Sequence, residues 1–307
     1  MNPTRATAFV HNSNSKLKID PNWPVLPDHI TLFCVSGIAL DSRGYIYVAH
    51  RGDNPLLRFH PDGSFDREIA ADVLKKSRAD NLMGDKPIPM DLRNWLHYVH
   101  VDPWDNVWIT DVGRHLIMRF DPAGQLTKTL GVDGVSGCDA EHFYQPTHVC
   151  VMPSGEFFVS DGYGNSRVLK FSAEGKRVME WGSRGTAIGE FHTPHVITSD
   201  EDGKLYISDR ENDRVLVYDQ QGECLAEWPG LHSVDGLDYG PDGFIYAGAG
   251  LDGAILRLDK KGQLIDVWAE PGQFGYPHGI AIAPDGTIYT AETDCSRVLR
   301  STLVPSH

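Results

Sequence analysis

The sequence predicts an all-β fold, a six-bladed β-propeller closed by an N-terminal strand, because one strand-and-turn pattern recurs six times along 307 residues. The middle of each copy is a short run of aromatic and β-branched residues, the composition of a β-strand. Short strands repeated in this way are typical of propellers, whose radial closure protects sheet edges. The six runs occupy residues 45–50, 106–111, 156–161, 204–209, 244–249 and 287–292.

Turns rich in Asp, Pro and Gly stand before these runs, and such residues build tight hairpins. A second apolar strand follows each run, and a further Gly-containing turn, such as Asp62-Gly63, leads on to another strand. Each unit therefore contains three or four antiparallel strands, which is the content of one blade. The clearest turns before the runs are residues 41–44, 153–155, 200–203, 241–243 and 284–286.

The ring needs a closing strand, because the sixth copy stops near Ser301, before an outer strand of its own. We expect residues 6–12 to supply that strand. Two long intervals between strands, 69–96 and 130–144, are predicted excursions from the ring, and long loops on a rigid scaffold often carry function. Residues 1–307 are expected to form a single domain.

Composition and charge narrow the classes of function. The 28 basic and 42 acidic residues give a formal net charge of −14 without a basic run, so nucleic acid is not an expected partner. The sequence contains neither a signal peptide core nor the roughly 20 apolar residues of a membrane helix, so we expect a cytoplasmic protein without membrane contacts. The five cysteines are odd in number and scattered, which favours a reducing compartment over a disulfide framework.

Three histidines fall at equivalent positions of the repeat. A lone histidine is more often a surface or hydrogen-bonded residue than a ligand, but alternate blades lie about one third of a turn apart, so three such histidines converge on the axis. A His₃ platform with an open face is predicted to bind a divalent metal, with Zn²⁺ as the first candidate. The first positions of the six innermost strands are Ser36, His97, Thr147, His195, Asp235 and His278.

The loops after the middle strands open on one mouth of the propeller. Arg51 and Arg210 follow the strands of blades one and four, and Tyr163 lies two residues beyond that of blade three. Ion pairs with neighbouring acids and a packed turn aromatic are the alternatives. An arginine beside a metal can clamp a carboxylate, and a tyrosine near a cation can act as a base. His148, one residue past its ring position, either supports the site, contacts the substrate or fills the tunnel.

From about Ile19 to the last blade, the sequence resembles peptidyl-α-hydroxyglycine α-amidating lyase, within the NHL-repeat propellers. The resemblance implies that His97, His195 and His278 bind zinc, that Tyr163 and Arg51 are catalytic, and that Arg210 is a second active-site arginine. It also implies cleavage of the carbinolamide C–N bond of a peptidyl-α-hydroxyglycine, giving an amide and glyoxylate. The motifs that carry it are His50-Arg-Gly-Asp53, Trp108-Ile-Thr-Asp-Val112, Gln145-Pro-Thr147, Ser160-Asp-Gly-Tyr163, Asn165-Ser-Arg167, Pro194-His195, Asp209-Arg-Glu-Asn212 and Pro277-His278.

Several positions depart from the family. Gly279 replaces an Asp that binds a structural calcium, which puts a calcium site in doubt. Tyr144 and Gly164 stand where secreted members carry a disulfide. His148 and Tyr276 replace an Asp and a Met, and we predict that both contact the substrate.

The leading hypothesis is a metal-dependent lyase that cleaves a C–N or related bond in a small hydroxylated carbonyl or amide substrate. One alternative is a metal-dependent hydrolase or hydratase, in which the open coordination position activates water. Another is a non-enzymatic propeller that binds partners, since a fold alone does not determine function. The reaction products separate the first two hypotheses, and the metal content tests the third.

Overall fold

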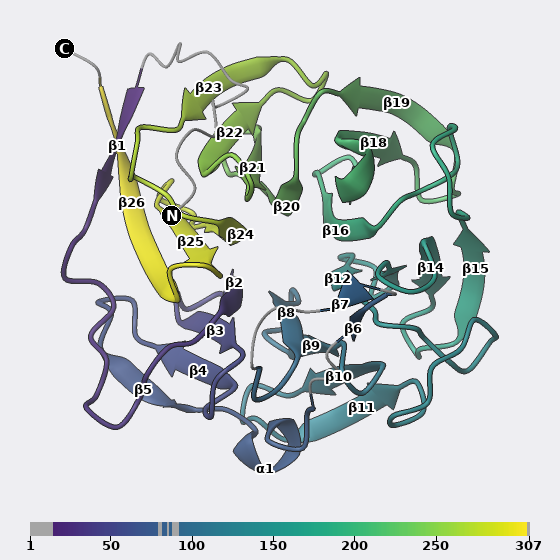
Figure 1. Cartoon of the computed structure of the whole chain (residues 1–307), viewed down its shortest axis with the longest axis horizontal. Helices are drawn as coiled ribbons and strands as arrows, with labels where there is room; N and C mark the ends of the chain where they lie inside the picture. Colours follow the sequence, from purple (N-terminus) through teal and green to yellow (C-terminus); the bar gives the residue numbers. More distant parts are fainter. Residues whose placement is uncertain (1–14, 79–81, 85, 88–91, 306–307) are drawn as a thin grey trace.

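A computed structural model describes residues 15–78, 82–84, 86–87 and 92–305. Six antiparallel sheets of four strands surround a central axis, which confirms the predicted six-bladed β-propeller (Figure 1). The innermost strands of neighbouring blades contact one another around that axis. Blade one contains β2 (Val35–Leu40), β3 (Ile46–His50), β4 (Leu56–Phe59) and β5 (Phe65–Glu68). Blade two contains β8 (Leu96–Val101), β9 (Val107–Asp111), β10 (Leu116–Phe120) and β11 (Leu126–Leu130). Blade three contains β12 (His148–Val151), β13 (Phe157–Asp161), β14 (Arg167–Phe171) and β15 (Arg177–Trp181).

The second half of the ring repeats this arrangement. Blade four contains β16 (Pro194–Ser199), β17 (Leu205–Asp209), β18 (Arg214–Tyr218) and β19 (Cys224–Pro229). Blade five contains β20 (Val234–Tyr239), β21 (Ile245–Ala249), β22 (Ala254–Leu258) and β23 (Leu264–Trp268). Blade six contains β24 (Pro277–Ile282), β25 (Ile288–Glu292), β26 (Arg297–Pro305) and the N-terminal β1 (Ser15–Ile19). The described helical segments are the short α1 (Ala71–Leu74) and the 3₁₀ turn η1 (Arg210–Asn212). No helix in these ranges is long and apolar enough to cross a bilayer.

The ring is closed by β1, which pairs with β26 from Ser15 opposite Pro305 to Ile19 opposite Ser301. Closure by an N-terminal strand is therefore confirmed, but the strand is Ser15–Ile19, whereas the predicted residues 6–12 lie outside the described residues. The prediction missed it because this strand lies on the outside of the sheet. Only Leu17 of its five residues is buried, so it carries little of the apolar pattern that marks a strand.

The 69–96 excursion contains α1 and a two-stranded sheet of β6 (Leu82–Met83) and β7 (Lys86–Pro87). In Figure 1 this small sheet lies over the region between β8 and β12, near the middle of the ring. The backbone N–H of Gly84 donates a 2.6 Å hydrogen bond to Gln145 Oε1. The excursion is thereby attached to the loop that precedes the inner strand of blade three.

Buried ion pairs hold the loops that follow the middle strands. Asp161 is fully buried, and its Oδ2 accepts hydrogen bonds from Asn165 Nδ2 at 2.7 Å and Arg167 Nε at 3.0 Å. Its Oδ1 accepts the N–H of Tyr144 at 2.9 Å. Burial raises the pKa of Asp161 to about 6, and Asn165 and Arg167 limit the rise. Blade four repeats the arrangement with Asp209, Asn212 and Arg214.

The axis is filled by an aromatic ring in the layer directly after the six first positions. Tyr98 is 3% exposed, its hydroxyl accepts the N–H of Ile280 at 3.4 Å, and its ring centroid lies 4.3 Å from that of His148. The corresponding residues of blades one, five and six are glycines. A Cβ at Gly37 would lie 2.8 Å from the nitrogen of Val99, so small residues are needed where the strands converge.

The residues in this layer do not fit the calcium site that the family resemblance implies. Gly279 offers no carboxylate, and a Cβ there would lie 3.1 Å from the Cα of Gly37 and from the Cβ of Ala291, so a larger side chain would require its neighbours to shift. Calcium requires six to eight oxygen ligands, usually including carboxylates. We infer that Tyr98 packing takes the place of an ion on the axis.

We expect Arg167→Met to lower the apparent free energy of unfolding by about 3–5 kcal/mol, because it leaves the carboxylate of Asp161 buried without its cation. Urea denaturation at neutral pH measures this loss. The matched control is Arg177→Met, since Arg177 pairs with Glu180 at the surface and exposed pairs contribute at most about 1 kcal/mol. Equal losses in the two variants would contradict the assignment.

We expect Tyr98→Ala to destabilise the protein by about 3–5 kcal/mol through the cavity that it leaves. Tyr98→Phe removes only the long hydroxyl contact and should cost about 1 kcal/mol. We would measure the melting temperatures of both variants and the wild type, first after dialysis that removes calcium and then with calcium chloride added. A calcium-dependent rise in the melting temperature of the wild type would show that an ion, rather than Tyr98, holds the axis.

Candidate active site

The structure brings His97, His195 and His278 together at the axis, on the inner strands β8, β16 and β24. All three are buried, and one ring nitrogen of each lies within 4.8 Å of the other two. The ring centroids are 4.7 to 5.0 Å apart. The convergence expected from equivalent positions in alternate blades is therefore present.

Hydrogen bonds to the backbone determine which nitrogen of each histidine faces the axis. The Nδ1 of His97 lies 2.7 Å from the carbonyl oxygen of Thr147, that of His195 lies 2.8 Å from Asp235 O, and that of His278 lies 2.6 Å from Ser36 O. A carbonyl only accepts, so each Nδ1 carries the proton. The unprotonated Nε2 is then left for a ligand, which is the arrangement of metal-binding imidazoles.

Burial also keeps the three imidazoles neutral. Desolvation lowers the pKa of His97, His195 and His278 well below the usual value of histidine, and the nearby charge of Arg51 or Arg210 lowers it further. Metal ligation requires the neutral form. The donor set, three neutral imidazoles around one point, therefore fits a divalent transition metal such as zinc.

Tyr163 reaches the same point from the loop after β13. Its hydroxyl lies 2.8 Å from His97 Nε2 and 3.1 Å from His195 Nε2. The loop approaches so closely because residue 162 is glycine: a Cβ there would lie 2.1 Å from the carbonyl oxygen of Pro194. Burial raises the pKa of the Tyr163 phenol, while Arg210 and Arg51 counter the rise.

Both predicted arginines lie beside this tyrosine, but their partners differ. The Nη1 of Arg210 is 3.5 Å from the Tyr163 hydroxyl and 3.2 Å from Asp235 Oδ1, and its Nη2 is 2.9 Å from Glu211 Oε1. Arg51 donates at 3.4 Å to Leu96 O, and no carboxylate of the described residues lies within ion-pair distance of it. Arg210 is thus paired with two carboxylates, whereas Arg51 has no carboxylate partner in the part of the chain that the structure describes.

A cavity of about 450 Å³ adjoins the histidine ring, and His278 and Tyr163 both line it. Met83 and Pro87 of the small sheet form one wall, so the excursion contributes to the pocket. Tyr276 and Trp95 line it too, and the predicted contact between Tyr276 and the substrate stays a prediction. The residues of the cavity that carry the chemistry are Arg51, Tyr163, Arg210, Tyr276 and His278.

His148 lies apart from this cavity. It lines a second one, of about 260 Å³, around the far ends of the inner strands, together with His100 and Asp238. The Nδ1 of His148 accepts the N–H of Ile197 at 3.4 Å, and His100 and Asp238 accept from blades three and six in the same way. The geometry therefore favours a tunnel-filling role for His148 over the predicted substrate contact. Its imidazole accepts a backbone N–H at the inner edge of the neighbouring sheet.

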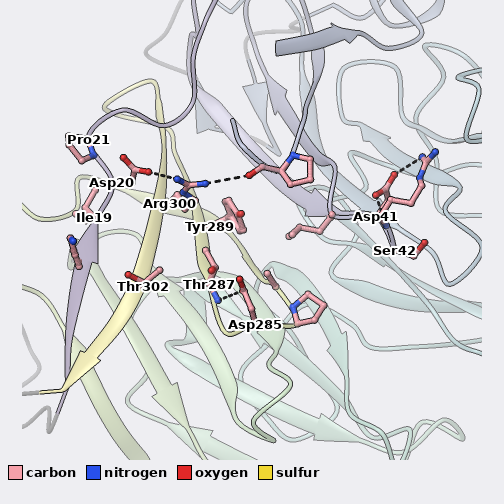
Figure 2. Close-up of a pocket in the computed structure, with 17 residues that line it drawn as sticks. Ile19, Asp20, Pro21, Asp41, Ser42, Asp285, Thr287, Tyr289, Arg300 and Thr302 are labelled. Carbon is pink, nitrogen blue, oxygen red and sulfur yellow. Dashed lines mark hydrogen bonds and ion pairs between the residues drawn. The ribbon is translucent and has the colours of Figure 1, made fainter. Parts of the chain in front are cut away.

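A larger cavity, of about 730 Å³, lies where the ring closes, between β1, β26 and blade one (Figure 2). Both arginines that line it form ion pairs within the protein, Arg300 with Asp20 and Arg43 with Asp41. No histidine of the described residues lines it. We regard it as the seam of the propeller and not as the candidate active site.

Sequence reasoning missed two residues, Asp235 and Met83, that contact the Arg210 guanidinium beside Tyr163. Asp235 was recognised only as a ring position, although its carboxylate reaches Arg210. Met83 lies in an excursion without a repeat pattern, and its sulfur is 3.9 Å from Arg210 Nη2. A charged residue at a ring position was the available signal for Asp235, whereas no sequence signal placed Met83.

The structure also shows how the residues at two further positions that differ from the family, Tyr144 and Gly164, contact each other. Gly164 N donates to Tyr144 O at 3.1 Å, and a Cβ at Gly164 would meet the Tyr144 ring at 2.2 Å. The tyrosine therefore packs on the glycine where secreted family members carry a disulfide. All five cysteines are free thiols.

Comparison with known proteins supports the same family. The NHL repeat model matches residues 143–171, which include Tyr163. Peptidyl-glycine alpha-amidating monooxygenase A of Xenopus laevis is 30% identical over 331 residues, which cover 96% of this chain and 34% of the relative. Peptidyl-alpha-hydroxyglycine alpha-amidating lyase 1 of Drosophila melanogaster is 28% identical, covering 90% of this chain and 58% of the relative. The chain thus spans about a third of the length of the frog protein.

Solved structures share the fold at low sequence identity. A streptogramin B lyase structure superposes with a TM-score of 0.63 at 15% identity, covering 95% of this chain and 98% of that one. A chain of a nidogen/laminin complex gives a TM-score of 0.60 at 17% identity, covering 80% and 84%. These likenesses establish the architecture alone, while the sequence relatives define the family. The chain is therefore an NHL-repeat β-propeller similar to the peptidyl-α-hydroxyglycine α-amidating lyases.

Proposed function

We propose that this chain is a metal-dependent lyase that cleaves the C–N bond of a small carbinolamide bearing a carboxylate, as in an N-acyl-α-hydroxyglycine. The observation that carries the proposal is the Tyr163 hydroxyl, 2.8 Å from the Nε2 of His97 within a ring of three neutral imidazoles. The names of relatives at 26–30% identity supply the substrate class.

His97, His195 and His278 would hold the metal through Nε2. A bound divalent ion supplies Lewis acidity at the open face of such a platform. The protein prepares that face by fixing each imidazole with a backbone carbonyl, so the three nitrogens are oriented before any ligand arrives. It also excludes water from below, because the Tyr98 layer fills the axis.

Tyr163 is the proposed base. In its ionised form, the phenolate oxygen accepts the proton of the substrate hydroxyl. The electron pair left on that oxygen forms the carbonyl of glyoxylate, and the C–N bond breaks with its pair on nitrogen. Return of the proton from Tyr163 to this nitrogen completes the amide, so no water is consumed.

The two arginines have different tasks in this scheme. Arg51 has no carboxylate partner among the described residues and can clamp the substrate carboxylate through two parallel hydrogen bonds. Arg210 lies with its guanidinium carbon 5.3 Å from the Tyr163 ring centroid, and its charge lowers the pKa of the phenol. The substrate is thus oriented by one arginine and its base is activated by the other.

Elemental analysis of the purified protein tests the metal. We expect about one transition metal per chain, and its loss in the His195→Ala variant, because two imidazoles rarely complete a protein zinc site. His60→Ala, on an exposed histidine outside the ring, is the matched control. Full metal content in His195→Ala, or none in the wild type after incubation with zinc, would remove the metal from the proposal.

Activity on N-benzoyl-α-hydroxyglycine tests the reaction. We expect benzamide and glyoxylate, with kcat about 10²–10⁴-fold lower in Tyr163→Phe because the general base is lost. Tyr289→Phe, on β25 at the seam between blades six and one, is the control. Benzoate labelled by ¹⁸O-water in place of benzamide would indicate a hydrolase, and neither product from the metal-loaded protein would favour a binding module.

A further inference from the structure

Asp235 is a carboxylate at a position where the other odd blades carry hydroxyl groups. It is fully buried at the ring position of blade five, whereas Ser36 and Thr147 stand there in blades one and three. Those hydroxyls donate to backbone carbonyls of the next blade, at 3.0 Å to Leu96 and 2.9 Å to Pro194. An ionised carboxylate cannot donate, so Asp235 does not perform that packing task.

The contacts of Asp235 lead instead to the active site. Its Oδ1 is 3.2 Å from Arg210 Nη1 and its Oδ2 accepts the hydroxyl of Ser233 at 3.0 Å. Its backbone carbonyl accepts the Nδ1 proton of His195 at 2.8 Å. A Cβ at Gly250 would lie 2.4 Å from Oδ2, so the carboxylate occupies a closely fitting space. One residue thus orients a metal-site histidine and an arginine.

The two ends of the Arg210 guanidinium are held separately. Nη2 meets Glu211 at 2.9 Å, towards the exposed rim, while Nη1 lies between Asp235 and the Tyr163 hydroxyl. Without Asp235 the buried end would lose its only carboxylate among the described residues. The guanidinium could then rotate away from Tyr163, or turn to the substrate carboxylate and compete with Arg51 for it.

We propose that Asp235 is the positioning residue that holds Nη1 of Arg210 against the Tyr163 hydroxyl and so reserves Arg51 for the substrate carboxylate. This inference rests on the proposed lyase function. It assigns Asp235 an action through Arg210 and not on the substrate itself. The effect of removing its charge must therefore depend on the presence of Arg210.

Kinetics with N-benzoyl-α-hydroxyglycine test this dependence. We expect Asp235→Asn to lower kcat about 10- to 100-fold, the usual effect of losing an outer partner of a site, with KM changed less than about threefold and zinc content retained. In an Arg210→Gln background the same change should have no further effect on kcat, since coupled residues are non-additive. Asp238→Asn, on a half-buried aspartate of β20 away from Arg210, is the matched control and should leave both constants within about twofold.

An equal loss of kcat with and without Arg210, or a rise in KM at unchanged kcat, would overturn the proposal.

A second measurement does not need activity. It is ¹⁵N NMR of the arginine side chains, with the Arg210 signals assigned by comparison with the spectrum of the Arg210→Gln variant. Resolved Nη signals of a held guanidinium are expected in the wild type and their averaging in Asp235→Asn. Unchanged Arg210 signals in that variant would reject the positioning role, while absent lyase activity with averaged signals would reject only the reaction.

Discussion

The structure depends on how six inner strands satisfy their free backbone groups where they converge on the axis. Each innermost strand pairs on one side only, and a buried unpaired N–H or C=O is costly. The carbonyls of Ser36, Thr147 and Asp235 meet the Nδ1 protons of the histidines on the preceding blades. The same bonds that complete the backbone also turn three Nε2 atoms inward, so the closure of the propeller and the orientation of the candidate metal ligands are one arrangement.

The next layer fills the axis beneath the histidines. Tyr98 lies in this layer, and Gly37, Gly236 and Gly279 let the inner strands approach one another closely there. Polar side chains beyond it accept backbone N–H groups of neighbouring blades. We therefore expect Tyr98 to brace the axis where the family resemblance would assign a calcium ion. Tyr163 lines the cavity that Met83 borders, so in the proposed function a substrate reaches Tyr163 from this side.

The repeat predicted the blades and the histidine ring because both depend on register, which a period in the sequence records directly. It could not locate β1, whose outward face lacks apolar residues, nor the small sheet of the excursion, which has no counterpart in other blades. It placed His148 next to the ring correctly, but one residue along a strand changes the face and the level of a side chain. Asp235 shows the remaining limit, since its partner Arg210 follows a different strand and their contact is set by tertiary packing.

The charges around Tyr163 favour a substrate with one negative group. Burial makes the phenol harder to ionise, and two nearby cations counter that effect. If both arginines were unpaired, a single carboxylate could bind either one, and the distance from the reacting carbon to the base would not be fixed. Asp235 and Glu211 form ion pairs with Arg210, so in the proposed function Arg51 is the residue that anchors an anion. If Arg51 is the anchor and Tyr163 the base, a carboxylate beside a hydroxylated carbon has one orientation in the pocket, which is why we propose an α-hydroxyglycine as the substrate.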